Sequence, residues 1–407
     1  MFACLIRFAF PVLFLALFLG AYRLLGKNMD RSQLTLERRQ PRSISHRREV
    51  DPRIVSDEQL FAVLDRLQPP TEWTNTNVLL HALRLWGPLA EFNDDRVPSG
   101  ERLRQYFLDD AAFRKLAGSD APPLYRIDAE TGQVHVRDWS PADPDRVSSS
   151  YHLNDILATL AETGTSLDTA LRTRDGDTTV ERLLDTAMGQ MHFRQHEFEW
   201  SAISYARYVY PESGWRNDYG ERITAAEVVR ELVGPLTLTY GPCNGLHRLE
   251  AMVVLWGADQ ELGPATSRGD ERARQRLRDQ MLRYMRQVVA LLEVSQHIDG
   301  YWTRAWPAGQ KAQTDENASL SDHILVTGHH LEWLALAPSE LDVPNEMVVR
   351  ATQWVVRAIQ EVDDQVLRRG YGPFSHAVRA LCLWRSKDPY EAWRQYKGQQ
   401  KSAADPA

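Results

Sequence analysis

Six histidines in this 407-residue chain share one arrangement. Each stands close to the start of an apolar helical run and has a charged residue three positions later, a spacing that puts both side chains on one face of a helix. The histidines are His81, His152, His196, His247, His329 and His376, and their partners are Arg84, Asp155, Glu199, Glu250, Glu332 and Arg379. A neutral imidazole beside a carboxylate can act as a general base near neutral pH, and the same pair can bind a divalent metal.

The pairs also have a purely structural interpretation. Acidic residues are favoured in the first turn of any helix, because the helix dipole is positive there. A polar pair that recurs in every unit can also connect neighbouring units, as consensus residues do in repeat proteins. His46 with Glu49 and His135 with Asp138 have the same spacing without heading an apolar run, so placement is the informative feature. No familiar metal-binding spacing occurs, so no residue is assigned to a metal and the cofactor stays open.

A second stretch with helical periodicity precedes each of the six histidines, which predicts six helical hairpins. These preceding stretches cover residues 54–68, 101–117, 179–191, 225–234, 270–294 and 346–362. Ser56, Thr178 and Thr224 each stand three positions before a glutamate or glutamine, a capping box that marks a helix start. The second helix of each hairpin is the more apolar, as expected for a helix enclosed by neighbours. We therefore predict an all-α fold, an (α/α)6 toroid with six inner and six outer helices.

Four segments make up the predicted chain. They are an N-terminal membrane anchor or signal segment, a basic flexible linker, the toroid domain and a disordered tail, at residues 1–25, 26–50, 51–396 and 397–407. Residues 124–128 and 133–138, joined through Thr131-Gly132, predict a short β-hairpin inserted in the second unit.

The N-terminal segment carries the prediction of a membrane partner. An almost unbroken apolar run extends from Phe8 to Tyr22 between Arg7 and Arg23, which is typical of a signal peptide or a membrane anchor. An uncleaved anchor is favoured, because Leu19-Gly20-Ala21 is only a passable cleavage site. The predicted localisation is membrane-anchored; the side of the globular domain stays open, with the cell envelope favoured.

The distribution of charge along the chain limits the class of macromolecule that it can bind. The chain has a formal net charge of −7, although its first 48 residues are strongly basic, so the remainder is strongly acidic. An acidic body argues against nucleic acid as the main partner. The three cysteines, Cys4, Cys243 and Cys382, provide no paired disulfide framework.

Two short stretches resemble known families. Residues Gln296-His297-Ile298-Asp299-Gly300-Tyr301-Trp302 resemble the Q-x-x-D-G-x-W signature of the terpenoid cyclase and prenyltransferase superfamily, whose fold is an α/α toroid. There the Gln caps the end of an outer helix and the Trp packs between hairpins, so the resemblance implies fold rather than chemistry. The family's D-x-D-D acid motif and its zinc-binding Asp-x-Cys pair do not occur, since Cys243 follows Gly241-Pro242.

Residues Gly328-His329-His330-Leu331-Glu332-Trp333 resemble the G-H-x-x-E-W segment of the N-acylglucosamine and cellobiose 2-epimerases, whose fold is also an (α/α)6 barrel. This resemblance covers six residues. It implies that His329 takes part in proton transfer at a sugar carbon and that Glu332 helps to hold it.

Taken with the neighbouring aromatic residues, these features predict a membrane-tethered toroid that binds and processes a carbohydrate or glycan in a His/Glu/Trp-lined cavity. Proton transfer is assigned to His329, Glu332, His247 and Glu250. Substrate binding is assigned to His196, Glu199, Trp200, Trp333, Tyr301, Trp302, His376 and Arg379. Two alternatives stay open: a terpenoid-cyclase-like enzyme, which predicts an apolar cavity for a lipid, and a non-catalytic scaffold for protein partners, which predicts a plugged central hole.

Overall fold

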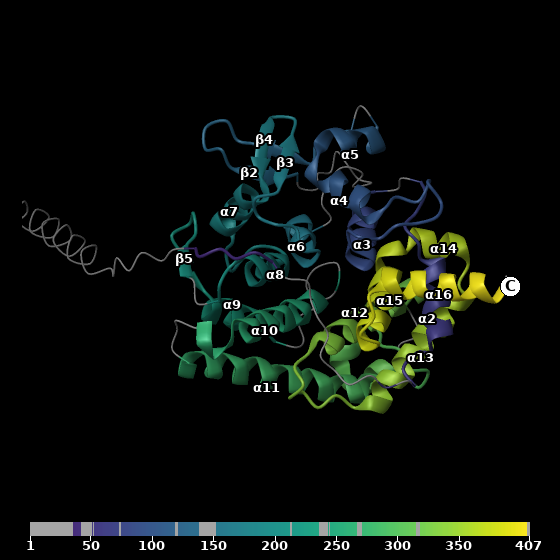
Figure 1. The fold of residues 1–407 in the computed structure, drawn as a ribbon. Helices are drawn as coiled ribbons and strands as arrows, with labels where there is room; N and C mark the ends of the chain where they lie inside the picture. The colour runs from purple at the N-terminus through teal and green to yellow at the C-terminus, as the bar shows by residue number, and fades with distance from the viewer. Residues whose placement is uncertain are drawn as a thin grey trace, which may run out of the picture.

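The computed structural model describes most of the chain and is mostly helical (Figure 1). It describes residues 36–41, 51, 53–72, 75–118, 121–137, 152–211, 214–235, 243, 245–266, 271–314 and 318–404. The all-α class expected from the hydrophobic periodicity is confirmed.

Six helices carry the more apolar half of each predicted hairpin. They are α3 (Thr76–Trp86), α6 (Asp155–Glu162), α8 (Phe198–Tyr208), α10 (Leu246–Thr266), α12 (Leu320–Leu336) and α15 (Tyr371–Trp384). Each contacts the next in this order, and α15 in turn contacts α3. Burial extends nearly all round them: every residue from Val326 to Ala335 of α12 is buried. We call these six the inner helices.

The other half of each hairpin is a more polar helix. These are α2 (Asp57–Arg66), α4 (Gly100–Leu108), α5 (Asp110–Ala117), α7 (Val180–Gln190), α9 (Ala225–Leu232), α11 (Glu271–Ser295) and α13 (Asn345–Glu361). All lie within or at the edges of the predicted stretches. The stretch 101–117 is two helices, because Asp109 interrupts the first and its side chain caps the second by accepting from the N–H of Ala111 and Ala112. The capping box at Ser56 is confirmed, whereas α7 is capped by Thr179 rather than Thr178.

Three antiparallel β-hairpins lie beside the helices. The predicted one pairs β1 (Tyr125–Ile127) with β2 (Val134–Val136). The other two, which were not predicted, pair β3 (Ala170–Thr173) with β4 (Gly176–Thr179) and β5 (Gly214–Arg216) with β6 (Arg222–Thr224). Each leads directly into α7 or α9, and their turns contain Asp175-Gly176 and Tyr219-Gly220, ordinary hairpin turn signals.

The membrane prediction is contradicted. Within the described part of the chain, none of the helices combines the length and the apolar character needed to cross a bilayer. Residues 1–25, on which the predicted anchor falls, lie outside the described residues.

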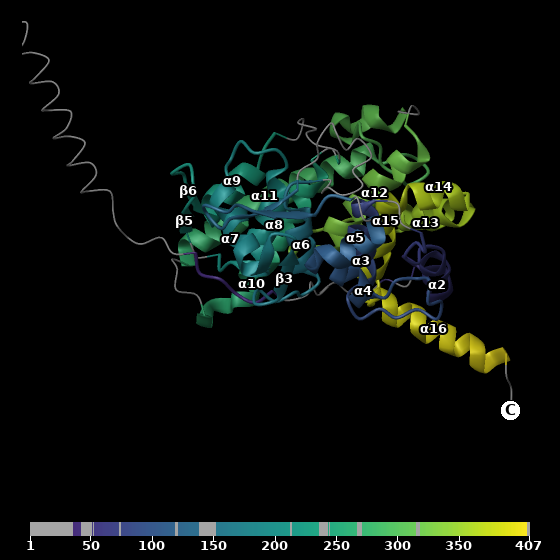
Figure 2. The same ribbon diagram turned by 90° about the horizontal axis from the view of Figure 1, so that it is seen from above.

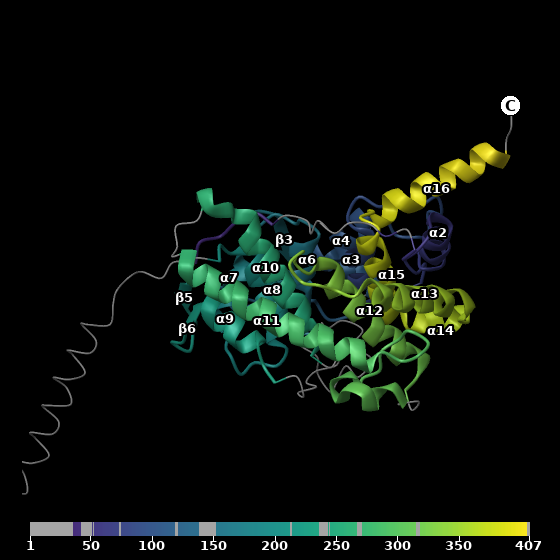
Figure 3. The ribbon, with the colours of Figure 1, turned by 90° about the horizontal axis from the view of Figure 1, so that it is seen from below.

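Both predicted flexible ends contain ordered residues. Within the predicted linker, residues 36–41 run alongside α8, and the N–H of Arg39 donates to the carbonyl oxygen of Tyr208 at 2.7 Å. The short helix α14 (Asp364–Arg369) precedes α15, and α16 (Pro389–Ala404) continues through residues predicted as a disordered tail. Trp393 of α16 is buried near α2, and the helix then projects from the rest of the molecule (Figures 2 and 3).

The stretch from Gln296 to Trp302 ties three helices together. The Gln296 side-chain amide donates to the carbonyl oxygens of Gly300, at 2.8 Å, and of Met347 at the start of α13, at 2.9 Å. The indole N–H of Trp302 donates back to the carbonyl oxygen of Leu292 in α11, at 2.9 Å. The backbone N–H of Trp302 donates to Thr327 Oγ1 of α12, at 3.0 Å. Residues 296–302 therefore fix the positions of α11, α12 and α13 relative to one another.

Replacement of Gly300 by alanine tests this junction. Gly300 has a φ of +111°, and an added Cβ would lie 2.4 Å from the carbonyl oxygen of Arg350. Strain and overpacking together predict a loss of about 3 kcal/mol in the free energy of unfolding, measured by urea denaturation. Gly257→Ala in α10 is the control, since its Cβ would meet nothing within 4 Å and alanine favours a helix. Equal stability of the two variants would contradict the prediction.

Candidate functional site

Five imidazoles form a continuous row between the inner helices. Ring centres of successive members lie 5.1 Å apart from His152 to His247, 5.1 Å from His247 to His329, 3.8 Å from His329 to His376, and 4.9 Å from His376 to His81. The row is almost entirely buried, and its members come from α3, α10, α12, α15 and the residues just before α6. We call these five residues the histidine row.

Backbone acceptors fix two members of the row. His81 Nδ1 lies 2.7 Å from the carbonyl oxygen of Asn77, and His329 Nδ1 lies 2.8 Å from that of Leu325. A carbonyl oxygen only accepts, so both Nδ1 atoms carry a proton. The neutral ring then has a lone pair on Nε2.

Carboxylates orient two further members. His376 Nδ1 lies 2.6 Å from Glu332 Oε2, and His152 Nδ1 lies 2.6 Å from Glu197 Oε2. Glu197 holds this position with a φ of +53°, a left-handed conformation that is uncommon for a residue other than glycine. The sequence pattern instead paired His152 with Asp155, and it assigned substrate binding to His196 and Glu199 on either side of Glu197.

Burial keeps four members of the row uncharged, namely His81, His247, His329 and His376. Removal from water, together with the nearby Arg84 guanidinium, lowers the pKa of His81 to about 3. Removal from water also lowers the pKa of His329 to about 4, and it lowers the pKa values of His247 and His376 well below the ordinary range. At neutral pH these imidazoles therefore offer lone pairs rather than positive charge.

One helical turn beyond the histidines lies a cluster of charged side chains. Its members, which we call the charged cluster, are Arg84, Glu162, Glu250, Glu332 and Arg379. Arg84 donates from Nε to Glu162 Oε2 at 2.7 Å and from Nη2 to Glu250 Oε1 at 2.5 Å. Arg379 binds Glu332 and lies 3.6 Å from Glu250 Oε1.

The charged cluster contains two guanidinium groups and three carboxyl groups, so protonation of one carboxyl group balances its charge. Burial, reinforced by Glu332 and Glu162, raises the pKa of Glu250 to about 8, although Arg84 acts in the opposite direction. Glu250 is therefore largely protonated at neutral pH and can act as an acid.

A pocket of 1160 Å³ opens onto this cluster from the C-terminal ends of α3, α6 and α15. Arg84, Glu162 and Arg379 line its inner end, and Trp86 and Tyr390 are among its other lining residues. The pocket lies at the C-terminal ends of the inner helices, whereas the sequence pattern placed the histidines and their charged partners close to the helix starts. The histidine row lies one turn deeper.

Three buried polar atoms of the charged cluster lack a hydrogen-bond partner. They are Arg84 Nη1, Glu162 Oε1 and Glu250 Oε2. An unpaired buried polar group costs free energy, so these atoms favour a ligand that both donates and accepts hydrogen bonds.

The structure brings together six of the twelve predicted site residues in the histidine row and the charged cluster. They are His247, Glu250, His329, Glu332, His376 and Arg379. Trp200 joins them, since its ring lies 4.5 Å from that of His247 and 5.1 Å from the Arg84 guanidinium carbon.

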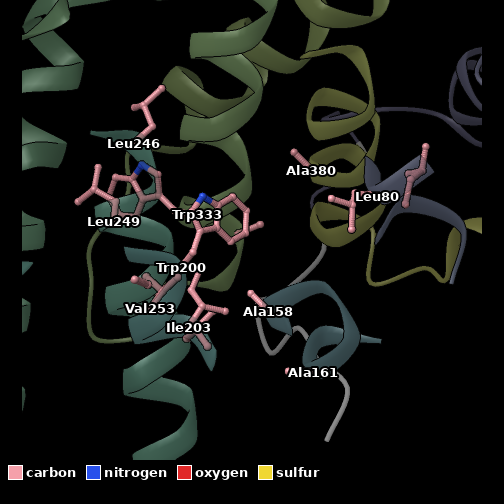
Figure 4. Close-up of a cluster of buried hydrophobic side chains, with 14 of the residues drawn as sticks. Leu80, Ala158, Ala161, Trp200, Ile203, Leu246, Leu249, Val253, Trp333 and Ala380 are labelled. Atoms are coloured by element: carbon pink, nitrogen blue, oxygen red, sulfur yellow. The ribbon is translucent and has the colours of Figure 1, made fainter. Parts of the chain in front are cut away.

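The other predicted residues lie elsewhere. His196 is exposed, and Glu199 pairs with Arg248 at 3.5 Å. The indole of Trp333 is wholly buried, donates to His330 and belongs to the apolar cluster drawn in Figure 4. Tyr301 stacks between His297 and His323, and Trp302 is a core residue. Packing in the core explains the positions of Trp333, Tyr301 and Trp302.

The 2-epimerase resemblance also differs in detail. Glu332 was expected to hold His329, but it pairs with His376, and His329 binds the backbone of its own helix. His329 lies in the middle of α12, because this helix begins at Leu320.

Sequence analysis missed Glu162, Glu197 and Cys243. Glu162 follows Asp155 by seven residues, two helical turns, which puts it on the inward face of α6. The buried Cys243 lies close to His152 and His247, and their ligand atoms are all within 4.8 Å of one another. Burial raises the pKa of the Cys243 thiol, so it is protonated at neutral pH.

Comparison with known proteins gives no relative: no family model, no curated protein and no solved structure matches this chain.

Proposed function

We propose that this chain is an (α/α)6 toroid that binds a carbohydrate in the 1160 Å³ pocket, and that Glu250, which does not line the pocket but is hydrogen-bonded to Arg84 at its inner end, supplies a proton to the bound sugar. The unpartnered atoms of Arg84, Glu162 and Glu250 carry the proposal. A sugar hydroxyl donates one hydrogen bond and accepts others, so it can satisfy a carboxylate and a guanidinium together.

Two observations support the toroid. The inner helices contact one another in chain order, and the last of them contacts the first. Gln296 and Trp302 also make the capping and packing contacts that the terpenoid cyclase resemblance implies.

Charge favours a sugar over the alternatives. A lipid substrate predicts an apolar, aromatic cavity, whereas the inner end of this pocket carries Arg84, Glu162 and Arg379. A scaffold gains nothing from Arg84 Nη1 and Glu162 Oε1, two buried atoms without a hydrogen bond at the end of a pocket, since each unmade hydrogen bond costs stability.

We assign the role of general acid to Glu250 rather than to His329. The protonated carboxyl group of Glu250 can give its proton to a sugar oxygen and leave a carboxylate that Arg84, at 2.5 Å, stabilises. Proton transfer by Glu250 therefore weakens as the pH rises through about 8, because the pKa of this group is raised by burial.

The test is calorimetric titration with a panel of hexoses, N-acetylhexosamines and hexuronic acids. We expect one class to bind, and Glu162→Gln to weaken its binding at least about tenfold, the usual effect of a lost charge-assisted hydrogen bond. Glu271→Gln is the matched control, because Glu271 is an exposed glutamate on α11. Failure of every sugar class to bind, or equal effects of both variants, would overturn the proposal.

A further inference from the structure

We propose that His247, His329 and His376 bind one divalent transition-metal ion through their ring nitrogens, with His81 as the fourth ligand. One ligand nitrogen from each of the first three lies within 4.8 Å of those of the other two, and all three side chains are buried. The inference stands apart from the proposed carbohydrate site, since none of these residues lines the 1160 Å³ pocket.

The main evidence for a metal ion is that two ring nitrogens, each with a lone pair, face each other. His81 Nε2 and His376 Nε2 lie 3.1 Å apart. The Nδ1–H of His81 donates to the carbonyl oxygen of Asn77. The Nδ1–H of His376 donates to Glu332, which also accepts from Arg379. Two neutral rings therefore face each other with no proton between them. A cation that accepts both lone pairs turns this repulsion into coordination.

The surroundings are those of metal-binding histidines. A histidine ligand usually donates its other ring N–H to a carboxylate or a backbone carbonyl, which fixes the ring and the tautomer. His376 does so to Glu332, and His81 and His329 do so to carbonyl oxygens one turn earlier in their own helices. Each of these three rings thus directs Nε2 into the row.

Distances fit a tetrahedral ion after a small adjustment. Zinc binds imidazole nitrogen at about 2.0–2.1 Å, so two ligands of a tetrahedral site lie about 3.3 Å apart. His329 Nε2 and His247 Nε2 are 3.2 Å apart, close to this value. Among His247, His329 and His376 the widest separation, up to 4.8 Å, closes if the rings shift by roughly 1 Å, whereas His81, which lies outside this group and next to His376, must move further.

The donor set selects the kind of metal. Imidazole suits zinc, cobalt, nickel and copper, whereas magnesium and calcium require oxygen ligands. Glu332, bound to the ligand His376, supplies negative charge beside the ion.

Metal titration of the full chain, stripped with a chelator, tests the site. The probes are Co²⁺, followed by its visible ligand-field absorption, and Zn²⁺, followed by calorimetry. We expect one ion per chain, with the intense absorption of tetrahedral Co²⁺. His329→Asn should weaken binding at least 100-fold, and Glu332→Gln, which changes only the orientation of His376, should weaken it about 10- to 100-fold.

His330→Asn is the control, because His330 is buried on the same helix but faces Trp302 and Trp306 rather than the row. It should leave the metal affinity unchanged, and circular dichroism verifies that both variants fold. Three outcomes overturn the proposal: no binding of Co²⁺ or Zn²⁺, an octahedral Co²⁺ spectrum, or equal loss of affinity in His329→Asn and His330→Asn. None depends on a sugar, so the two proposals fail separately.

Discussion

Acid should unfold the metal-free protein over a narrow pH range below 6.5. Five buried histidines stay neutral in the folded chain because burial lowers their pKa values; they are His81, His247, His329, His330 and His376. In the unfolded chain each binds a proton near pH 6.5. Their contribution to stability is therefore complete above pH 6.5 and is lost as the pH falls towards their folded pKa values, which are about 3 for His81 and about 4 for His329.

The expected effect is large. Each proton bound only by the unfolded chain costs about 1.4 kcal/mol per pH unit, so five cost roughly 7 kcal/mol per unit. Folded domains have only about 5–15 kcal/mol of stability, which places the loss of structure near pH 5. Glu250 acts in the opposite direction with a single proton, since its raised pKa favours the folded state at low pH.

Urea denaturation between pH 7.5 and pH 4.5 measures this dependence. His330→Phe removes one buried titrating group and should make the slope shallower by about 1.4 kcal/mol per pH unit. His196→Phe, at an exposed position, should leave the slope unchanged. A stability that varies little over this range would show that the histidines are not held neutral.

Replacement of Arg84 by methionine should destabilise the fold by about 3–5 kcal/mol. This guanidinium is the hydrogen-bond partner of both Glu162 and Glu250, and all three side chains are at most 4% exposed. Its removal leaves carboxyl groups in an apolar environment without their counter-charge, which is costlier than the loss of an exposed ion pair. Thermal and urea unfolding measure the change.

Arg96→Met provides the comparison. Arg96 pairs with Asp94 at 2.7 Å, but its side chain is 79% exposed, so its replacement should leave the free energy of unfolding almost unchanged. Adding Glu162→Gln to Arg84→Met should recover part of the stability, because an amide needs no counter-charge. Equal costs at Arg84 and Arg96 would mean that the charged cluster is solvated.

Local sequence signals predicted most of the helices. The outer helices have polar and apolar faces in the 3.6-residue period, which reports directly on burial. The predicted helix boundaries were wrong where a single side chain determines where a helix starts or ends. Asp109 splits one predicted helix in two, and Ser319 with Asp322 forms a capping box that starts α12 earlier than expected. The hairpins before α7 and α9 are too short to show a clear alternating pattern.

The site was only partly predictable, because spacing along one helix says nothing about neighbouring helices. The three-residue spacing placed His247 with Glu250 on one face of α10 and His376 with Arg379 on one face of α15. It could not show that Glu332 binds His376 from another helix. The left-handed backbone at Glu197 replaces His196 at the site, and no periodicity predicts such a one-residue shift.

The pairing of His81 with His376 joins positions 295 residues apart. During synthesis α3 leaves the ribosome long before α15, so four members of the histidine row are made before the fifth. The nascent chain therefore has no complete site at any intermediate length. Binding competence arises in one late step, when the last hairpin docks, and a chain that lacks α15 would leave His81 without its neighbour in the histidine row.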